Sequence, residues 1–228
     1  LALASHQRAA AAYDAGFFDD LVFEFNGVQR DDNLRRDTSL ARLATLKPAF
    51  PVDGSATLTA GNSTPMTDGA AAVLLASEDW ARARGLPVQA YLTFGKVAAV
   101  DFLQDEGLLM APAYAVPRML DDAGLTLQDF DFYEIHEAFA AQVLCTLAAW
   151  ESAEFCRDRL GRERPPGSID RARLNVNGSS LAVGHPFAAT GARIVATLAK
   201  LIDQRGGGRG LISICTAGGM GVTAIVER

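Results

Sequence analysis

The residues best suited to chemistry in this sequence are two histidines and a cysteine, each beside a turn. His185 stands between Gly184 and Pro186, which aim its side chain because glycine frees the backbone while proline restricts the residue before it. His136 falls where a strand pattern meets a helix pattern, and Cys215 at the mouth of a glycine turn. Imidazole is a base near neutral pH and a thiol can give or take a proton, so these residue types suit acid–base chemistry.

Each of the three residues also has a purely structural interpretation. His185 can cap a helix from a glycine-rich loop, and His136 can be a core histidine bonded to backbone at a helix start. Cys215 can be a small apolar strand residue. Residue types alone leave these alternatives open.

Three segments must position the candidate residues. Residues 190–202 predict a buried helix directly after the His185 loop, with small residues in its first turn. Residues 133–142 predict a buried strand that runs into a helix around His136. Residues 213–227 predict two strands joined by the glycine turn that follows Cys215.

The rest of the second half alternates strand and helix patterns. Residues 88–95 predict a strand, residues 117–124 the end of a helix, and residues 130–135 another strand. This order predicts an α/β fold with a mostly parallel sheet and helices on both of its faces. In the first half, strands are expected at residues 21–25 and within residues 57–77, where the second strand would be buried.

Three motifs occur in sequence order: H-E-A-F-A at residues 136–140, G-H-P at residues 184–186 and C-x-x-G-G-x-G at residues 215–221. Together they resemble the thiolase family. The resemblance implies a thiolase-like fold of two α/β halves, of which the second is complete here and the first partial. It assigns residues 1–86 to the remainder of the N-terminal half, including the CoA-binding loop region, and residues 87–228 to the C-terminal domain.

The resemblance implies an acyltransferase that uses CoA to cleave a 3-ketoacyl-CoA into acetyl-CoA and a shortened acyl-CoA in fatty-acid β-oxidation. Many family members have asparagine where His136 stands, and a histidine there resembles the degradative branch with the trifunctional-enzyme β-subunit. The alternatives within the family are a biosynthetic acetoacetyl-CoA thiolase or a lipid-transfer-type relative. A non-catalytic CoA-binding or assembly subunit is the alternative from another class.

The resemblance also implies roles for single residues. His185 matches the residue that activates the nucleophilic cysteine and helps bind a thioester oxygen. Cys215 matches the cysteine that exchanges a proton with the reacting carbon. The ring of His136 would hold a water or bind the thioester oxygen, and the N–H of Ala217 would form part of an oxyanion hole, for which Ala217 needs a negative φ.

Three further residues are expected to bind CoA. Arg35 matches an arginine that meets the nucleotide end of CoA, although its mixed-charge surroundings are also typical of a solvated surface. Thr64 lies in a turn that resembles the lining of the pantetheine tunnel, where Thr64-Pro65 replaces a common Ser-Gly. Phe139 is expected along the pantetheine arm, or in the core.

Composition limits the partners and the cell compartment. The net charge of −6 over 228 residues argues against broad binding of nucleic acid or anionic membrane, which both need a basic surface. Three cysteines without metal-ligand spacing, and no signal peptide or membrane-spanning run, predict no metal site and a reducing, cytoplasmic location. No cofactor is expected, since CoA is a substrate. The resemblance implies a homodimer or tetramer, with a β-oxidation multienzyme α-subunit as a further partner.

The sequence also indicates that the chain is truncated. It does not begin with Met, and residues 1–10 resemble the middle of an amphipathic helix. In the thiolase family the nucleophilic cysteine lies upstream of the segment that resembles residues 5–12. Cys145 and Cys156 lie within and after an alanine-rich helix and are expected to be small buried thiols.

Overall fold

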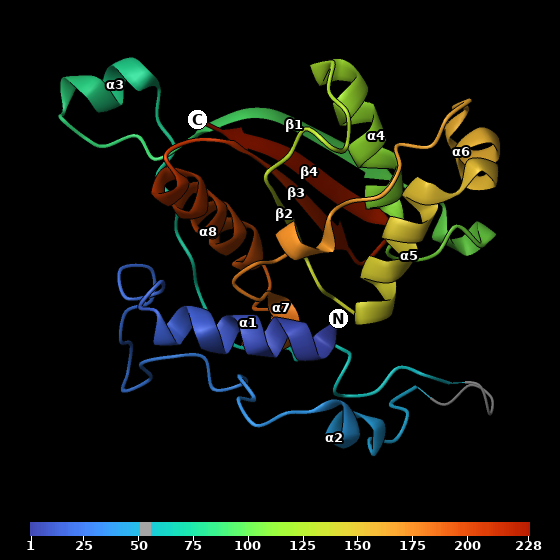
Figure 1. Cartoon of the computed structure of the whole chain (residues 1–228), viewed down its shortest axis with the longest axis horizontal. Helices are drawn as coiled ribbons and strands as arrows, with labels where there is room; N and C mark the ends of the chain where they lie inside the picture. The colour runs from blue at the N-terminus through green and yellow to red at the C-terminus, as the bar shows by residue number, and fades with distance from the viewer. Residues whose placement is uncertain (51–55) are drawn as a thin grey trace. The chain divides into compact units, whose positions relative to one another are not determined.

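The computed structural model describes residues 1–50 and 56–228 and divides the chain into two compact units. The first unit joins Leu1–Gly69 to Ile135–Phe187, and the second joins Ala70–Glu134 to Ala188–Arg228. Each unit therefore combines two stretches that are distant in the sequence. Figure 1 colours the elements along the chain.

The first unit is mainly helical. Its helix α1 packs along α7, where Ala9 contacts Ala182 and Val183 in one buried cluster. A Cβ on Gly178, which has φ +72°, would lie 2.4 Å from the carbonyl oxygen of Ser5, so only glycine allows this close approach. The helices of this unit are α1 (Ala2–Asp14), α2 (Leu40–Ala44), α5 (Ala140–Glu151), α6 (Ala153–Leu160) and α7 (Ser180–Val183), with a 3₁₀ turn at Arg171–Arg173.

The four described strands form one sheet in the order β1-β4-β3-β2. They are β1 (Tyr91–Ala99), β2 (Phe132–Ile135), β3 (Arg209–Thr216) and β4 (Met220–Glu227). Strand β4 pairs antiparallel with both β3 and β1, so the predicted mostly parallel sheet is wrong. The physical reason is the short turn after β3, because a parallel pair needs a crossover of about a dozen residues or more.

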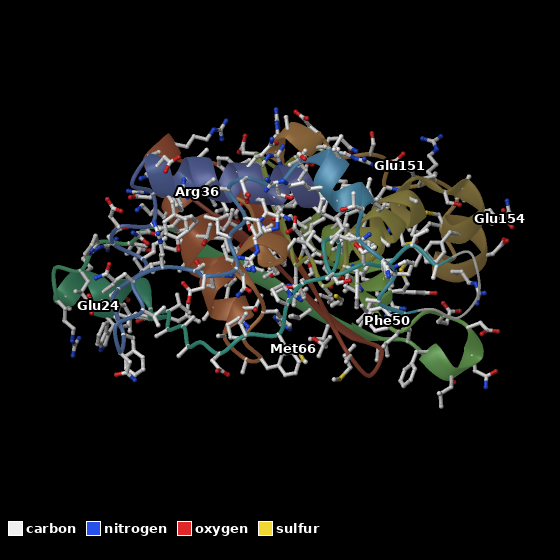
Figure 2. The ribbon with its side chains drawn as sticks, turned by 90° about the horizontal axis from the view of Figure 1, so that it is seen from below. Glu24, Arg36, Phe50, Met66, Glu151 and Glu154 are labelled. Carbon is white, nitrogen blue, oxygen red and sulfur yellow. The ribbon has the colours of Figure 1, made fainter. Side chains whose placement is uncertain are left out.

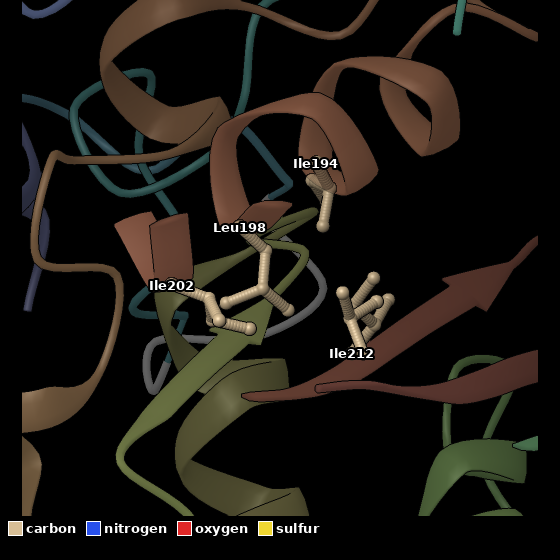
Figure 3. Close-up of a cluster of buried hydrophobic side chains, with 5 residues drawn as sticks. Ile194, Leu198, Ile202 and Ile212 are labelled. Atoms are coloured by element: carbon tan, nitrogen blue, oxygen red, sulfur yellow. The ribbon is translucent and has the colours of Figure 1, made fainter. Parts of the chain in front are cut away.

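Two helices of the second unit cover opposite faces of this sheet. Helix α8 (Thr190–Arg205) packs its Ile194, Leu198 and Ile202 against Ile212 and Val226, as Figure 3 shows for the labelled side chains. Helix α4 (Ala111–Ala123) contacts β1 and β4, and its Pro112 lies where a Cβ on Gly221 would be. Residues an odd number of positions apart in a strand point to opposite faces, as Gly221 and Val226 of β4 do. The predicted helices on both faces of the sheet are therefore confirmed.

The remaining elements of the second unit are short. Helix α3 (Glu78–Ala83) begins at the cap Ser77, whose side chain accepts the N–H of Trp80, and a 3₁₀ turn covers Phe102–Gln104. Within the described residues, every helix is too short or too polar to cross a lipid bilayer.

Local patterns predicted the segments around the candidate residues well. The helix expected at residues 190–202 is α8, and the hairpin expected at residues 213–227 is β3 with β4. The strand that runs into a helix around His136 is β2 followed by α5. The sequence therefore places both histidines and Cys215 at the ends of the elements predicted for them.

The three strands predicted in the first half do not form. The first one expected within residues 57–77 has only an isolated bridge between Pro48 and Thr59. Residues 21–25 carry only an isolated bridge between Phe25 and Val28, and Phe23 is 81% exposed. The apolar run that contains Leu74 is exposed and forms no strand, because no described segment pairs with its backbone.

Candidate active site

Two imidazole rings meet in the first unit. The ring centroids of His136 and His185 lie 4.2 Å apart, with 43° between the ring planes. His136 is 1% exposed, whereas His185 is half-buried. The buried ring can hold an oxygen atom of a ligand, while the partly accessible ring exchanges a proton with the same ligand.

His136 is held by the turn between β2 and α5. Its Nδ1 lies 2.7 Å from the hydroxyl oxygen of Ser180, the first residue of α7. The hydroxyl can donate to or accept from the ring, so this contact fixes the orientation of the imidazole and couples it to the loop of His185.

The backbone around His185 is fixed on two sides. Gly184 has φ +86°, and a Cβ there would lie 2.5 Å from Cγ2 of Thr67, so only glycine fits. The N–H of His185 donates to the carbonyl oxygen of Pro65 at 3.1 Å. Gly184 therefore takes a conformation that requires glycine, and the segment at residues 64–67 supports the backbone of His185.

A surface pocket of about 330 Å³ opens beside the histidine pair, within the first unit. Met66 at its rim is 81% exposed, and Figure 2 labels this side chain at the surface. The ring of Phe187 lies 5.0 Å from the ring of His185. The pocket offers an apolar rim beside one imidazole. Its lining residues are Met66, Thr67, Asp68, Gly69, His185, Pro186 and Phe187.

The predicted ligand-binding residues occupy different positions in the first unit. The Thr64 hydroxyl donates to the carbonyl oxygen of Ser180 at 2.7 Å, so Thr64 ties the supporting segment to α7. Phe139 precedes α5 and lies 6.1 Å from the ring of Phe50. Arg35 is exposed, and its Nη1 donates to the carbonyl oxygen of Asp32 at 3.4 Å.

Cys215 and Ala217 belong to the second unit and are described within it. Cys215 is the penultimate residue of β3 and is 5% exposed, and burial raises the pKa of its thiol to about 12. The thiol is therefore protonated at neutral pH and can donate its proton. Gly218 and Gly219 take the positive φ values of the turn, at +88° and +74°, whereas Ala217 does not, as its Cβ requires.

The raised pKa of Cys215 predicts how stability depends on pH. Between pH 9.0, the ordinary pKa of the thiol, and about pH 12, the unfolded chain releases this proton and the folded chain keeps it. The contribution of this thiol to the free energy of unfolding is fully present below pH 9. It is lost as pH rises toward about 12, by about 1.4 kcal/mol per pH unit. We expect urea unfolding to show that the free energy of unfolding falls less between pH 7 and pH 10 in Cys215→Ala than in wild type. Equal losses would contradict the assignment.

The other two cysteines differ from each other. Cys156 is buried, as predicted, and its Sγ lies 3.5 Å from the carbonyl oxygen of Ala149. Cys145 is exposed, so its predicted burial is wrong: it lies on the outer face of α5, where its helix neighbour Leu144 is also exposed. Over residues 1–50 and 56–228, no three His, Cys, Asp or Glu side chains gather as metal ligands would.

Sequence reasoning missed the residues that hold the histidine pair. Ser180, Glu137 and Asn175 are all buried and hydrogen-bonded around this pair. Glu137 lies within the H-E-A-F-A motif, and Asn175 and Ser180 lie a few residues before the G-H-P motif. In the sequence, however, glutamate, asparagine and serine at these positions look like ordinary turn and cap residues.

Comparison with known protein families accounts for nearly the whole chain. The family described as "Thiolase, N-terminal domain" matches residues 1–79, and "Thiolase, C-terminal domain" matches residues 86–228. A "3-ketoacyl-CoA thiolase" of Yersinia pestis (strain Pestoides F) is 46% identical over 233 residues, which cover 100% of this chain and 53% of that protein. The chain therefore spans about half the length of the curated relatives it matches.

Solved structures give the same picture. Acetyl-CoA acetyltransferase of Bacillus anthracis matches with a TM-score of 0.82 at 35% identity, over 100% of this chain and 54% of that one. Human mitochondrial 3-ketoacyl-CoA thiolase in complex with CoA matches with 0.78 at 33%, over 99% and 53%. The dimeric peroxisomal thiolase of Saccharomyces cerevisiae matches with 0.79 at 34%, over 100% and 53%.

Proposed function

Because the chain belongs to the thiolase family, we propose that the whole protein is a 3-ketoacyl-CoA thiolase of fatty-acid β-oxidation, an acetyl-CoA C-acyltransferase. The observation that carries the proposal is the contact between the rings of His136 and His185 beside an open pocket. A pair of imidazoles can supply both the base and the oxyanion donor that thiolytic cleavage requires.

In the proposed reaction a cysteine thiolate attacks the ketone carbon of the substrate. His185 takes the proton of that thiol, and the ring of His136 stabilises a developing oxyanion. When the carbon–carbon bond breaks, its electron pair stays on the acetyl-CoA carbon, and Cys215 protonates that carbon. Exchange with water then returns a proton to Cys215 and removes one from His185. The N–H of Ala217 stabilises the oxyanion of the acyl-enzyme step, in which the thiol of free CoA attacks the acyl carbon, His185 takes the proton of that thiol, and the cysteine that leaves takes the proton from His185.

We also propose how the chain divides and what it binds. Residues 1–86 would be the remainder of the N-terminal half and residues 87–228 the C-terminal domain. Arg35 would meet the nucleotide end of CoA, with Thr64 and Phe139 along its pantetheine arm. CoA is a substrate in this scheme, and no other cofactor takes part. We further propose that the whole protein is a homodimer or tetramer, that it has a β-oxidation α-subunit as a partner, and that it is located in the cytoplasm.

None of the three cysteines in the 228-residue chain is the proposed nucleophile. Cys145 lies in the middle of a helix, Cys156 is buried in another, and Cys215 has the donor role. We therefore expect the pure 228-residue chain to release no acetyl-CoA from 3-ketoacyl-CoA and CoA, while the full-length protein encoded by the gene does so over a range of acyl chain lengths.

Chromatography of the CoA esters tests both expectations. Turnover by the 228-residue chain would overturn the assignment of the nucleophile. Turnover of acetoacetyl-CoA alone by the full-length protein would instead favour a biosynthetic acetoacetyl-CoA thiolase. CoA binding without any turnover would favour a non-catalytic CoA-binding or assembly subunit.

His136 is predicted to act as an oxyanion donor. In the full-length protein, His136→Ala should lower kcat by on the order of 10²-fold to 10³-fold, since one donor to the oxyanion is lost. His136→Asn should restore much of the loss, because an amide N–H can reach the same oxygen directly or through water. Steady-state kinetics with both variants decide this. Full kcat in His136→Ala would make the residue structural.

A further inference from the structure

A carboxylate lies buried beside the histidine pair and takes no part in the chemistry proposed above. Glu137 follows His136 directly and is 2% exposed. Its Oε2 accepts from the Ser5 hydroxyl at 2.7 Å and from the N–H of Leu181 at 3.2 Å, and its Oε1 accepts from Nδ2 of Asn175 at 2.8 Å. A carboxylate offers acceptors only, so these three donors satisfy it without reversal.

The three donors belong to three separate parts of the first unit. Ser5 lies in α1, Leu181 in α7, and Asn175 in the loop that leads to α7. The Ser5 hydroxyl also accepts the N–H of Ser179 at 3.0 Å, which adds a second bond to the start of the His185 loop. Glu137 is therefore a junction between the turn of His136 and the segment that carries His185.

The amide of Asn175 is fixed in one orientation. Its Oδ1 accepts the N–H of Ile135 and its Nδ2 donates to the carbonyl oxygen of Ile135, each at 2.9 Å. An amide held by a backbone donor and a backbone acceptor cannot turn over without losing both bonds. Its Nδ2 is accordingly a permanent donor toward Glu137.

From these contacts we propose that Glu137 is a positioning residue for the reaction, and this proposal rests on the proposed thiolase function. The α7 residue next to Leu181 is Ser180, whose hydroxyl contacts Nδ1 of His136. The same short helix ends at Val183, and its cap Gly184 precedes His185. By holding α7 against its own turn, Glu137 sets the separation of the two imidazole rings.

Glu137→Gln tests this with almost no change of shape. Whichever way the new amide turns, its NH₂ faces a donor that cannot reverse, either Nδ2 of Asn175 or the N–H of Leu181. We expect kcat of the full-length protein to fall by roughly 10-fold to 100-fold, because misplaced reacting groups lose rate without losing affinity. KM for CoA should change by less than about threefold.

A second readout does not need activity. Histidine-labelled protein should give an NMR cross-peak between the rings of His136 and His185, whose centroids are 4.2 Å apart. The cross-peak should weaken or vanish in Glu137→Gln. If the protein has no thiolase activity, the proposed function fails, and the cross-peak alone still decides whether Glu137 positions the rings.

The control is Thr223→Val, which removes a buried hydroxyl that donates to the carbonyl oxygen of Ile212 in the sheet. It should lower the unfolding temperature and leave kcat and the cross-peak unchanged. If Glu137→Gln does not fold, Ser5→Ala replaces it, with an expected loss of about threefold to tenfold in kcat. Wild-type kcat and an intact cross-peak in folded Glu137→Gln, or in Ser5→Ala where Glu137→Gln is unfolded, would overturn the proposal.

Discussion

Replacing His185 by alanine is expected to lower kcat/KM of the full-length protein by on the order of 10⁴-fold at pH 7. The imidazole is the proposed base for the nucleophilic thiol, and it also lies beside the ring of His136, the proposed oxyanion donor. Without this base, only the small fraction of thiol that ionises unaided can attack. The measurement is thiolysis of a 3-ketoacyl-CoA under steady-state conditions.

The pH dependence of His185→Ala gives a sharper test than the size of the loss. A free thiol has a pKa of about 8.5 to 9, so the variant should recover rate as pH rises toward 9, while wild type gains much less. A matched control is Ala188→Gly in the same loop, where φ is +64° and glycine relieves strain. This control should keep activity within about twofold. A His185→Ala variant with no recovery at high pH would contradict the role of base.

The segments that carry the candidate residues were predictable because their signals are local. A glycine and a proline around His185, a strand pattern before His136 and a glycine turn after Cys215 each act over a few residues. The structure places all three where those patterns end. The domain boundary near residue 86 and the roles of the site residues stay predictions.

The direction of β1 in the sheet was not predictable from local signals. Strand β1 pairs with β4, so Tyr91 lies opposite Glu227, although the two residues are far apart in the sequence. Nothing in either strand specifies this pairing, because alternation of side chains is the same in parallel and antiparallel sheets. The alternating strand and helix patterns favoured a parallel arrangement, which β4 has with neither of its two neighbours.

The support of the histidine pair was missed for a similar reason. Ser180 and Thr64 look like ordinary turn and cap residues in the sequence, yet the Thr64 hydroxyl binds the Ser180 backbone and the Ser180 hydroxyl binds the ring of His136. Both contacts join segments far apart in the chain. A serine or threonine has local partners available in any sequence, so its long-range partner emerges only from the fold.

Replacing Cys215 by alanine is expected to separate the two halves of the proposed reaction. Burial raises the pKa of the thiol to about 12. In the proposed reaction this thiol protonates the acetyl-CoA carbon after bond cleavage, and no other step requires it. Thiolysis by the full-length protein should fall by on the order of 10³-fold. Exchange of labelled CoA into acetyl-CoA, which needs only the nucleophile and its base, should stay within about tenfold of wild type.

The contrast with His185 makes this prediction specific, since His185→Ala should lose exchange and thiolysis together. Cys156→Ala is the matched control, because it removes another buried thiol, one whose Sγ lies near the carbonyl oxygen of Ala149 and which has no role in the proposed reaction. It should cost stability and leave both rates near wild type. If Cys215→Ala keeps thiolysis, or loses exchange to the same extent as thiolysis, Cys215 is not the proton donor to carbon, and its burial in β3 serves the sheet alone.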